Sequence, residues 1–82
     1  MAEKEELNSI ISLLDFLIED TSLPRNIRKK IQEAKDVLNS NQDFQTKVSS
    51  AIQTLVQASE DVNMPMHGRT YIWDILTKLE AL

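Results

Sequence analysis

The sequence predicts an all-α fold, namely an up-down-up-down four-helix bundle made of two duplicated helical hairpins. Three observations predict it. The 82 residues suffice for one hydrophobic core and not for two, so we expect a single domain over 1–82. One glycine and two prolines are too few turn residues for a β-fold. Apolar residues recur at spacings of three and four, which places them on one face of a helix.

Four amphipathic helices are predicted in order, over about 3–19, 24–39, 42–60 and 65–81. Their apolar stripes are Leu7, Ile10, Ile11, Leu14, Leu17 and Ile18; Ile27, Ile31, Ala34 and Leu38; Phe44, Val48, Ala51, Ile52, Leu55 and Val56; and Ile72, Ile75, Leu76, Leu79 and Leu82. Polar residues at 39–41 form the middle linker. Because short connections make neighbouring helices antiparallel, these four helices form an up-down-up-down bundle.

The corners between paired helices contain Pro24 and Pro65, which we expect in the first turn of the second and fourth helices. Ser22 and Asn63 precede them as cap-type residues. Shifting the chain by 41 residues aligns 19–31 with 60–72, and both read Glu-Asp, three residues, Pro, three residues, Arg, two residues, Ile. We therefore interpret 1–41 and 42–82 as an internal repeat, whose two corners lie at the same end of the bundle.

The charge of −4 is unevenly distributed. The segment 24–38 contains five basic and two acidic residues, whereas the rest of the chain has a strong excess of acidic residues. A globally acidic protein is a poor polyanion binder, so nucleic acid stays only an alternative partner. The chain has no cysteine, no apolar run of the roughly 20 residues that span a bilayer, and an acidic segment at 3–6 where a signal peptide would be basic. We expect a cytoplasmic protein that does not interact with membranes.

The repeated corners supply the candidate binding surface. It comprises Asp20, Arg25, Arg28, Asp61, His67 and Arg69. The structural alternative is that each arginine stabilises its own corner by bonding acids or backbone carbonyls there. In that case we expect Asp20 and Asp61 to pair with Arg28 or Arg69. The basic residues of 24–38 are otherwise expected to form a solvated outer face.

Catalysis and metal binding have no support in the sequence. His67 is the only histidine, and one ligand does not make a metal site, so an exposed or capping histidine is expected. Adjacent acids on a helix point about 100° apart and do not form a catalytic pair. We predict no enzyme activity, no catalytic residue, no metal and no cofactor.

Some apolar residues lie off or beyond the main stripes. Leu13 and Phe16 lie off the stripe of the first helix, and Trp73 extends that of the fourth. They form part of a thick core, a homodimer seam or a groove for a partner protein. The function predicted is therefore a small, non-enzymatic protein-interaction module that self-associates. The alternative is a nucleic-acid- or ribosome-associated accessory protein that uses the basic face of the second helix.

The strings EDTSLPRNIRKKIQEAKDVL and NMPMHGRTYIWDILTKLE carry a resemblance that covers nearly the whole chain. With their LPRNIR and MPMHGRT-x-IW motifs, the sequence resembles an uncharacterised archaeal family of short all-helical proteins. This resemblance implies a compact helical bundle in an archaeal cytoplasm. It implies no activity, substrate, cofactor or functional residue.

Overall fold

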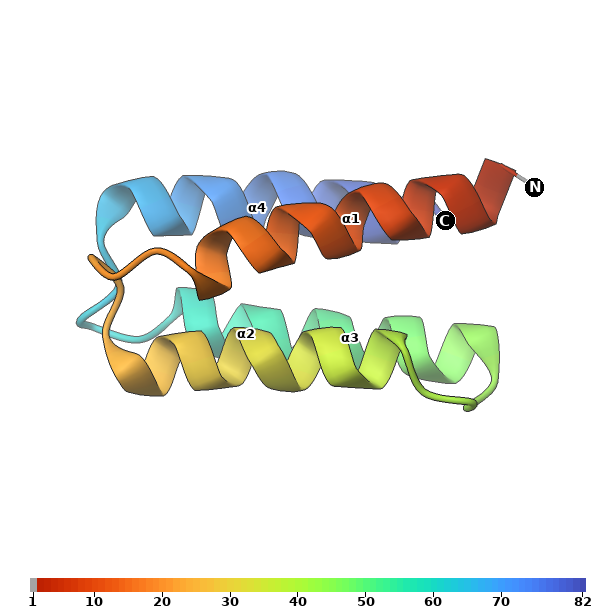
Figure 1. Cartoon of the computed structure of the whole chain (residues 1–82), viewed down its shortest axis with the longest axis horizontal. Helices are drawn as coiled ribbons and strands as arrows, with labels where there is room; N and C mark the ends of the chain where they lie inside the picture. The colour runs from red at the N-terminus through yellow and green to blue at the C-terminus, as the bar shows by residue number, and fades with distance from the viewer. Residues whose placement is uncertain (1) are drawn as a thin grey trace.

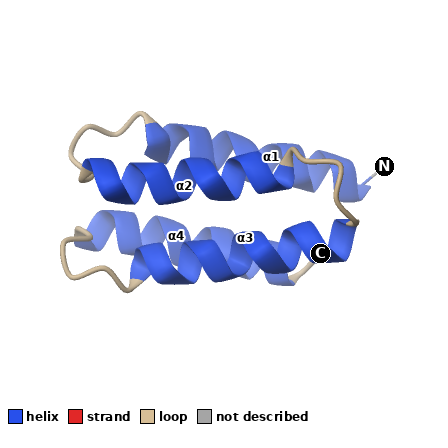
Figure 2. Cartoon of the chain, turned by 90° about the horizontal axis from the view of Figure 1, so that it is seen from below, coloured by secondary structure: helices blue, strands red, loops and turns tan. Residues whose placement is uncertain are grey.

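The computed structural model consists of four helices: α1 (Ala2–Ile18), α2 (Arg25–Leu38), α3 (Phe44–Ser59) and α4 (Met66–Glu80). It describes residues 2–82, and their side chains from Lys4 onward. Successive helices run antiparallel (Figure 1), α2 packs most extensively on α3, and α4 returns beside α1 to close the bundle. Figure 2 shows the two hairpins, α1–α2 and α3–α4, lying side by side. The predicted all-α four-helix bundle is confirmed.

A single apolar core runs the length of this 35 × 19 × 18 Å bundle. Its fully buried large side chains are Ile10, Leu14, Leu17, Leu23, Ile27, Ile31, Leu38, Leu55, Ile72, Ile75 and Leu79. The sequence predicted most of them but missed Leu23 and Met64, the buried corner residues before each proline. It was wrong about Val56, which is 36% exposed because it points about 100° away from the fully buried Leu55.

The starts of α2 and α4 differ from the prediction by one position. Pro24 and Pro65 are the N-cap residues, not members of the first turn, and their extended ψ angles of 150° and 154° precede the helix. Ser22 and Asn63 do not cap the helices, because neither start has a side-chain cap bond. The α3 start is capped by Asp43, whose carboxylate accepts the Thr46 N–H at 3.3 Å.

Both corners lie at one end of the bundle, opposite the α2–α3 linker (Figure 1). Their backbone hydrogen bonds correspond at the offset of 41 residues. Asp20 N–H donates to Leu17 O and Leu23 N–H to Asp20 O, and the second corner repeats this at Asp61 and Met64. This correspondence is what an internal repeat of 1–41 and 42–82 predicts. Among the helices described, none is long and apolar enough to cross a membrane.

The two corners pack against each other beside Gly68, a buried residue in the first turn of α4. A Cβ atom at Gly68 would lie 2.7 Å from the Met64 sulfur and 2.9 Å from a methyl group of Leu23. Both distances are far below ordinary van der Waals contact. The missing side chain of Gly68 therefore leaves the space that the two corner residues fill.

Replacing Gly68 with valine should reduce the free energy of unfolding by about 1–3 kcal/mol, because the new side chain overpacks the corner contact. Met64→Ala in the same chain should restore part of that loss, so the double variant should be more stable than the sum of the single changes predicts. Urea unfolding followed by circular dichroism measures all three. Strict additivity would contradict the proposed role of the Met64 contact.

Candidate functional site

The corner carboxylates shape their own corners. Asp20 Oδ1 accepts the Ser22 backbone N–H at 2.9 Å and the Ser22 hydroxyl at 2.6 Å. In the second corner, Asp61 Oδ1 accepts the Asn63 backbone N–H at 2.8 Å. An aspartate that bonds the backbone two residues onward closes a tight turn. One oxygen of each acid therefore fixes the chain between its helices.

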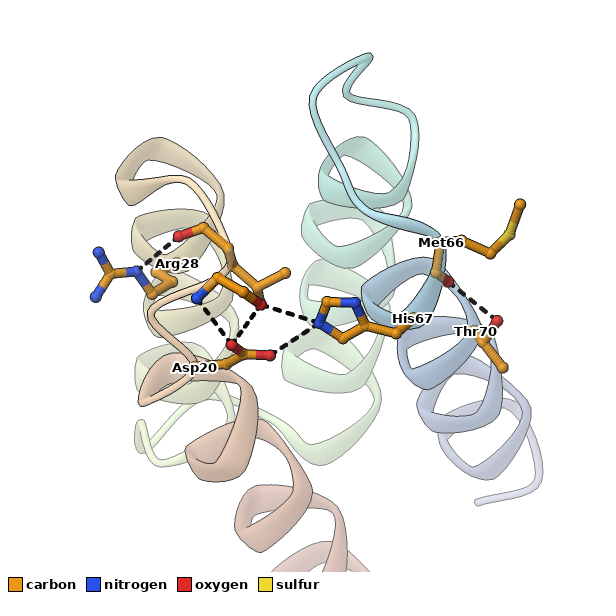
Figure 3. A network of polar contacts seen from close by, with 7 residues as sticks. Asp20, Arg28, Met66, His67 and Thr70 are labelled. Atoms are coloured by element: carbon orange, nitrogen blue, oxygen red, sulfur yellow. Dashed lines mark hydrogen bonds and ion pairs between the residues drawn. The ribbon is translucent and has the colours of Figure 1, made fainter.

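The second oxygen of each acid reaches the opposite hairpin. His67 Nε2 lies 3.0 Å from Asp20 Oδ2 (Figure 3), and Asn26 Nδ2 donates to Asp61 Oδ2 at 3.1 Å. His67 and Asn26 both lie in the first turn of their helices and are 41 positions apart, as are Asp20 and Asp61. The four side chains form two crossed contacts, which we call the corner clasp. It links the two hairpins at the corner end.

The corner clasp corrects the predicted pairing of the acids with Arg28 or Arg69. Each acid follows the C-terminal end of one helix, where the helix dipole opposes negative charge. Each also lies beside the first turn of a helix in the other hairpin, where unpaired N–H groups carry partial positive charge. The compensating partner of the acids is therefore the opposite helix start, and not an arginine.

Both arginines instead bond backbone carbonyls of their own corner, one of the two outcomes that the sequence predicted. Arg28 Nε donates to Leu23 O at 3.1 Å. Arg69 Nε donates to Ser59 O at 3.0 Å and its Nη2 to Asp61 O at 3.3 Å. Both side chains are half-buried. They supply donors to the carbonyl of Ser59 at the end of α3 and to the carbonyls of the corner residues Leu23 and Asp61.

Hydrogen bonding lowers the pKa of Asp20 from its ordinary 3.8 to about 2. The Ser22 hydroxyl contributes most, followed by His67 and then the Ser22 backbone N–H, and these bonds favour the charged carboxylate. The acid is therefore held ionised across the physiological pH range. It acts as a fixed hydrogen-bond acceptor, not as a proton donor.

The cluster of Asp20, Ser22 and His67 does not form a catalytic relay. A Ser–His–Asp triad binds serine and aspartate through different imidazole nitrogens. Here Ser22 Oγ, at 3.1 Å, and Asp20 Oδ2 both contact Nε2 of His67, which is exposed as predicted. In the region whose side chains are described, no three His, Cys, Asp or Glu residues are placed to hold a metal ion.

Not all of the candidate surface comes together. Arg25 is exposed at the start of α2 and takes no part in the corner clasp. Further along α2, Lys35 forms a 2.6 Å ion pair with Asp15 of α1, and Lys30 contacts Gln57 of α3 at 3.2 Å. The basic face is thus partly engaged in holding α2 to its neighbours.

The predicted dimer seam of Leu13, Phe16 and Trp73 is not one continuous surface. Phe16 lies against Tyr71, with ring centroids 5.5 Å apart, on the α1–α4 side. Trp73 points about 200° away from Tyr71 around α4 and lines a hollow with Val56 of α3. Leu13 is half-buried against the core. Trp73 lies apart from Phe16 because α4 presents its two exposed aromatic residues on opposite flanks.

Comparison with known proteins places the chain in a family. All of residues 1–82 match the model of a family described as "Uncharacterised protein family (UPF0147)". The chain belongs to this family. Its resemblance to an uncharacterised archaeal family is thereby confirmed.

Relatives from archaea share the similarity over nearly the whole chain. The "UPF0147 protein" of Methanothermobacter thermautotrophicus is 38% identical over 79 residues, covering 95% of this chain and 78% of the relative. That of Methanocaldococcus jannaschii is 41% identical over 80 residues, covering 96% and 86%.

Two crystal structures have the same fold. The unknown-function protein MMP1188 superposes with a TM-score of 0.93 at 42% identity, covering 96% of this chain and 91% of that one. A UPF0147 protein from Thermoplasma acidophilum superposes with a TM-score of 0.91 at 35% identity, covering 96% and 94%. Neither description names a biochemical function.

The lowered pKa of Asp20 gives stability a defined pH dependence. A carboxylate with a depressed folded-state pKa stabilises the fold above its unfolded pKa, near 3.8, and loses that contribution as pH falls towards 2. Asp20→Asn should therefore be less stable than the parent at pH 6, and the difference should shrink as pH falls from about 4 towards 2. Urea unfolding over this range measures it, with Asp74→Asn as an exposed control. A difference that stays constant with pH would be evidence against the clasp.

The arginine contacts predict unequal losses of stability. Arg69→Ala should cost about 1–2 kcal/mol, because it removes two charge-assisted bonds and leaves Ser59 O unpaired, while Asp61 O keeps the Met64 N–H. Arg28→Ala should cost less, about 1 kcal/mol, because it removes a single charge-assisted bond. Thermal and urea unfolding give both values. Arg28→Ala proving the more harmful would contradict this assignment.

Proposed function

We propose that the protein is a non-enzymatic interaction module that presents a helical surface to another protein in the cytoplasm. The observation that supports this is the α3–α4 flank, where Trp73 is 55% exposed and Met66 is 72% exposed. The hollow beside Trp73 is lined by side chains of both helices. Exposed aromatic residues next to a hollow are typical of binding surfaces, because they bury much apolar area at low entropic cost.

The polar groups of the corner end have internal roles that fit this proposal. Asp20, Asp61 and His67 contact one another's hairpins, and Arg28 and Arg69 satisfy backbone carbonyls. These contacts occupy groups that a reaction would need free. We therefore assign a structural role to the corner end and the binding role to the α3–α4 flank.

The alternative is a nucleic-acid-associated role for α2. Arg25 and Lys29 favour it, because both are exposed and neither forms an ion pair within the side chains described from residue 4 onward. The pairing of Lys30 and Lys35 with acids, and the net charge of −4, weigh against it.

Affinity purification of the tagged protein from its native cells separates these roles. We expect a bound protein to be retained after nuclease treatment and at raised salt, since an apolar contact is little screened. With Trp73→Gln, the amount of that protein recovered should fall at least about tenfold. With Phe16→Gln, the matched change on the other flank, the recovery should be unchanged. Loss of the bound protein on nuclease treatment, or steeply with salt, would instead support the role of α2 in binding nucleic acid.

A further inference from the structure

The internal repeat allows the residues that line the hollow of the second hairpin to be compared with the corresponding residues of the first. The volume of the hollow is about 530 Å³. The lining residues are Val56, Ser59, Glu60, Arg69, Trp73 and Leu76. The residues 41 positions earlier are Asp15, Ile18, Glu19, Arg28, Gln32 and Lys35. The acid and the arginine are the same in both sets, so the difference lies in the other positions.

At three of the four differing positions the first hairpin is polar and the second apolar, whereas Ser59 corresponds to the apolar Ile18. Asp15 and Lys35 join α1 to α2 by a 2.6 Å ion pair, and the positions corresponding to them are held by Val56 and Leu76. Gln32 corresponds to Trp73. The same trend extends to the start of α4, where exposed Met66 corresponds to Arg25 of the first hairpin.

This difference is not required by the fold. The first hairpin shows that polar side chains at these positions are compatible with the same helix packing. Exposed Trp73 and Val56 therefore add little to the core of the second hairpin, yet they present apolar area to water. Such area, bordered by charged groups, is typical of a surface that a partner covers.

The spacing of charges on α4 indicates which partner fits. Arg69, Trp73, Leu76 and Glu80 are separated by four, three and four residues, so they form one stripe along the α3 side of the helix. The stripe is self-complementary in the antiparallel direction. Around the midpoint between 74 and 75, Arg69 lies as far on one side as Glu80 does on the other, and Trp73 mirrors Leu76.

The two charges at the ends of this stripe are available for such a contact. Within the side chains described from residue 4 onward, neither Arg69 nor Glu80 forms an ion pair. Arg69 uses Nε and Nη2 for the corner carbonyls, and its Nη1 makes no hydrogen bond within that region. A copy rotated by a twofold axis would bring Glu80 opposite Arg69 on both sides of the interface.

We propose that the partner of the α3–α4 flank is a second copy of this chain. In the dimer, α4 packs antiparallel on α4 of the second copy, and each Trp73 enters the hollow of the other subunit against Leu76. Arg69 pairs with Glu80 across the interface at both ends. The proposal rests on the interaction role inferred above and gives that role a specific occupant.

Analytical ultracentrifugation of the full chain over the micromolar range tests the dimer. Trp73→Gln, which installs the residue of the first hairpin, should raise the dimer dissociation constant at least about 30-fold, as expected for a central aromatic anchor. Phe16→Gln should leave it within about twofold. Circular dichroism should show both variants folded, because Gln32 and Gln57 occupy the positions of the other hairpin that correspond to Trp73 and Phe16. Trp73 is the only tryptophan, so its fluorescence should also change on dilution.

Charge reversal tests the direction of packing. Glu80→Lys places like charges opposite Arg69 and should weaken the dimer about 3- to 10-fold, while a positive charge at the end of α4 is compatible with the helix. Glu19→Lys makes the same change of net charge beyond the end of α1 and should have no effect. Equal effects of the two would refute the antiparallel pairing.

The possible outcomes separate this dimer from the broader interaction role. A 9.4 kDa monomer at all concentrations would overturn the dimer. If Trp73→Gln nevertheless lost a different protein in the affinity purification, the interaction role would stand with another occupant. A dimer unaffected by Trp73→Gln would show that copies meet elsewhere and would also overturn the proposal. A dimer weakened by Trp73→Gln and Glu80→Lys, and by neither control, is the expected result.

Discussion

The corner clasp joins two hairpins that could otherwise slide along each other. Helix packing in a bundle is tolerant of register, because apolar ridges repeat every turn. The contacts of His67 with the Asp20 carboxylate and of Asn26 with the Asp61 carboxylate have no such repeat, so they fix how far one hairpin extends past the other. The space left by Gly68 allows the corners to come close enough for these bonds. The packing of the core and the position of the α3–α4 flank both depend on this register.

Local patterns predicted the helices well. Apolar spacing located the four helices, and the prolines located the corners, since both signals act over a few residues. The partners of Asp20 and Asp61 lie 47 and 35 residues away, so they depend on how the hairpins meet. The repeat alignment did carry a signal, because it pairs Asn26 with His67, two side chains able to donate to a carboxylate. Recognising it required knowing that the corners touch.

The sequence predicted that both arginines bond within the corners, but it did not predict which acceptors they bond. A helix that ends leaves carbonyl groups without donors, and an arginine eight residues past the acid can return to them. The sequence does not distinguish this arrangement from an ion pair with the acid, because both lie within reach of the same flexible side chain. The exposure of Val56 was missed for a related reason. It borders the apolar stripe, and only the closeness of the neighbouring helix determines whether such a border position is covered.

The linker at 39–43 lies at the end of the bundle opposite the corners (Figure 1) and joins the two helices that pack most extensively, α2 and α3. Its contribution is therefore chiefly to keep the hairpins at a high local concentration, in the millimolar range for a short connection. A chain cut there would consist of two fragments, whose association would depend on dilution. In this sense the protein is a tethered heterodimer of two helical hairpins. The interface between the hairpins determines how they associate, and the linker does not.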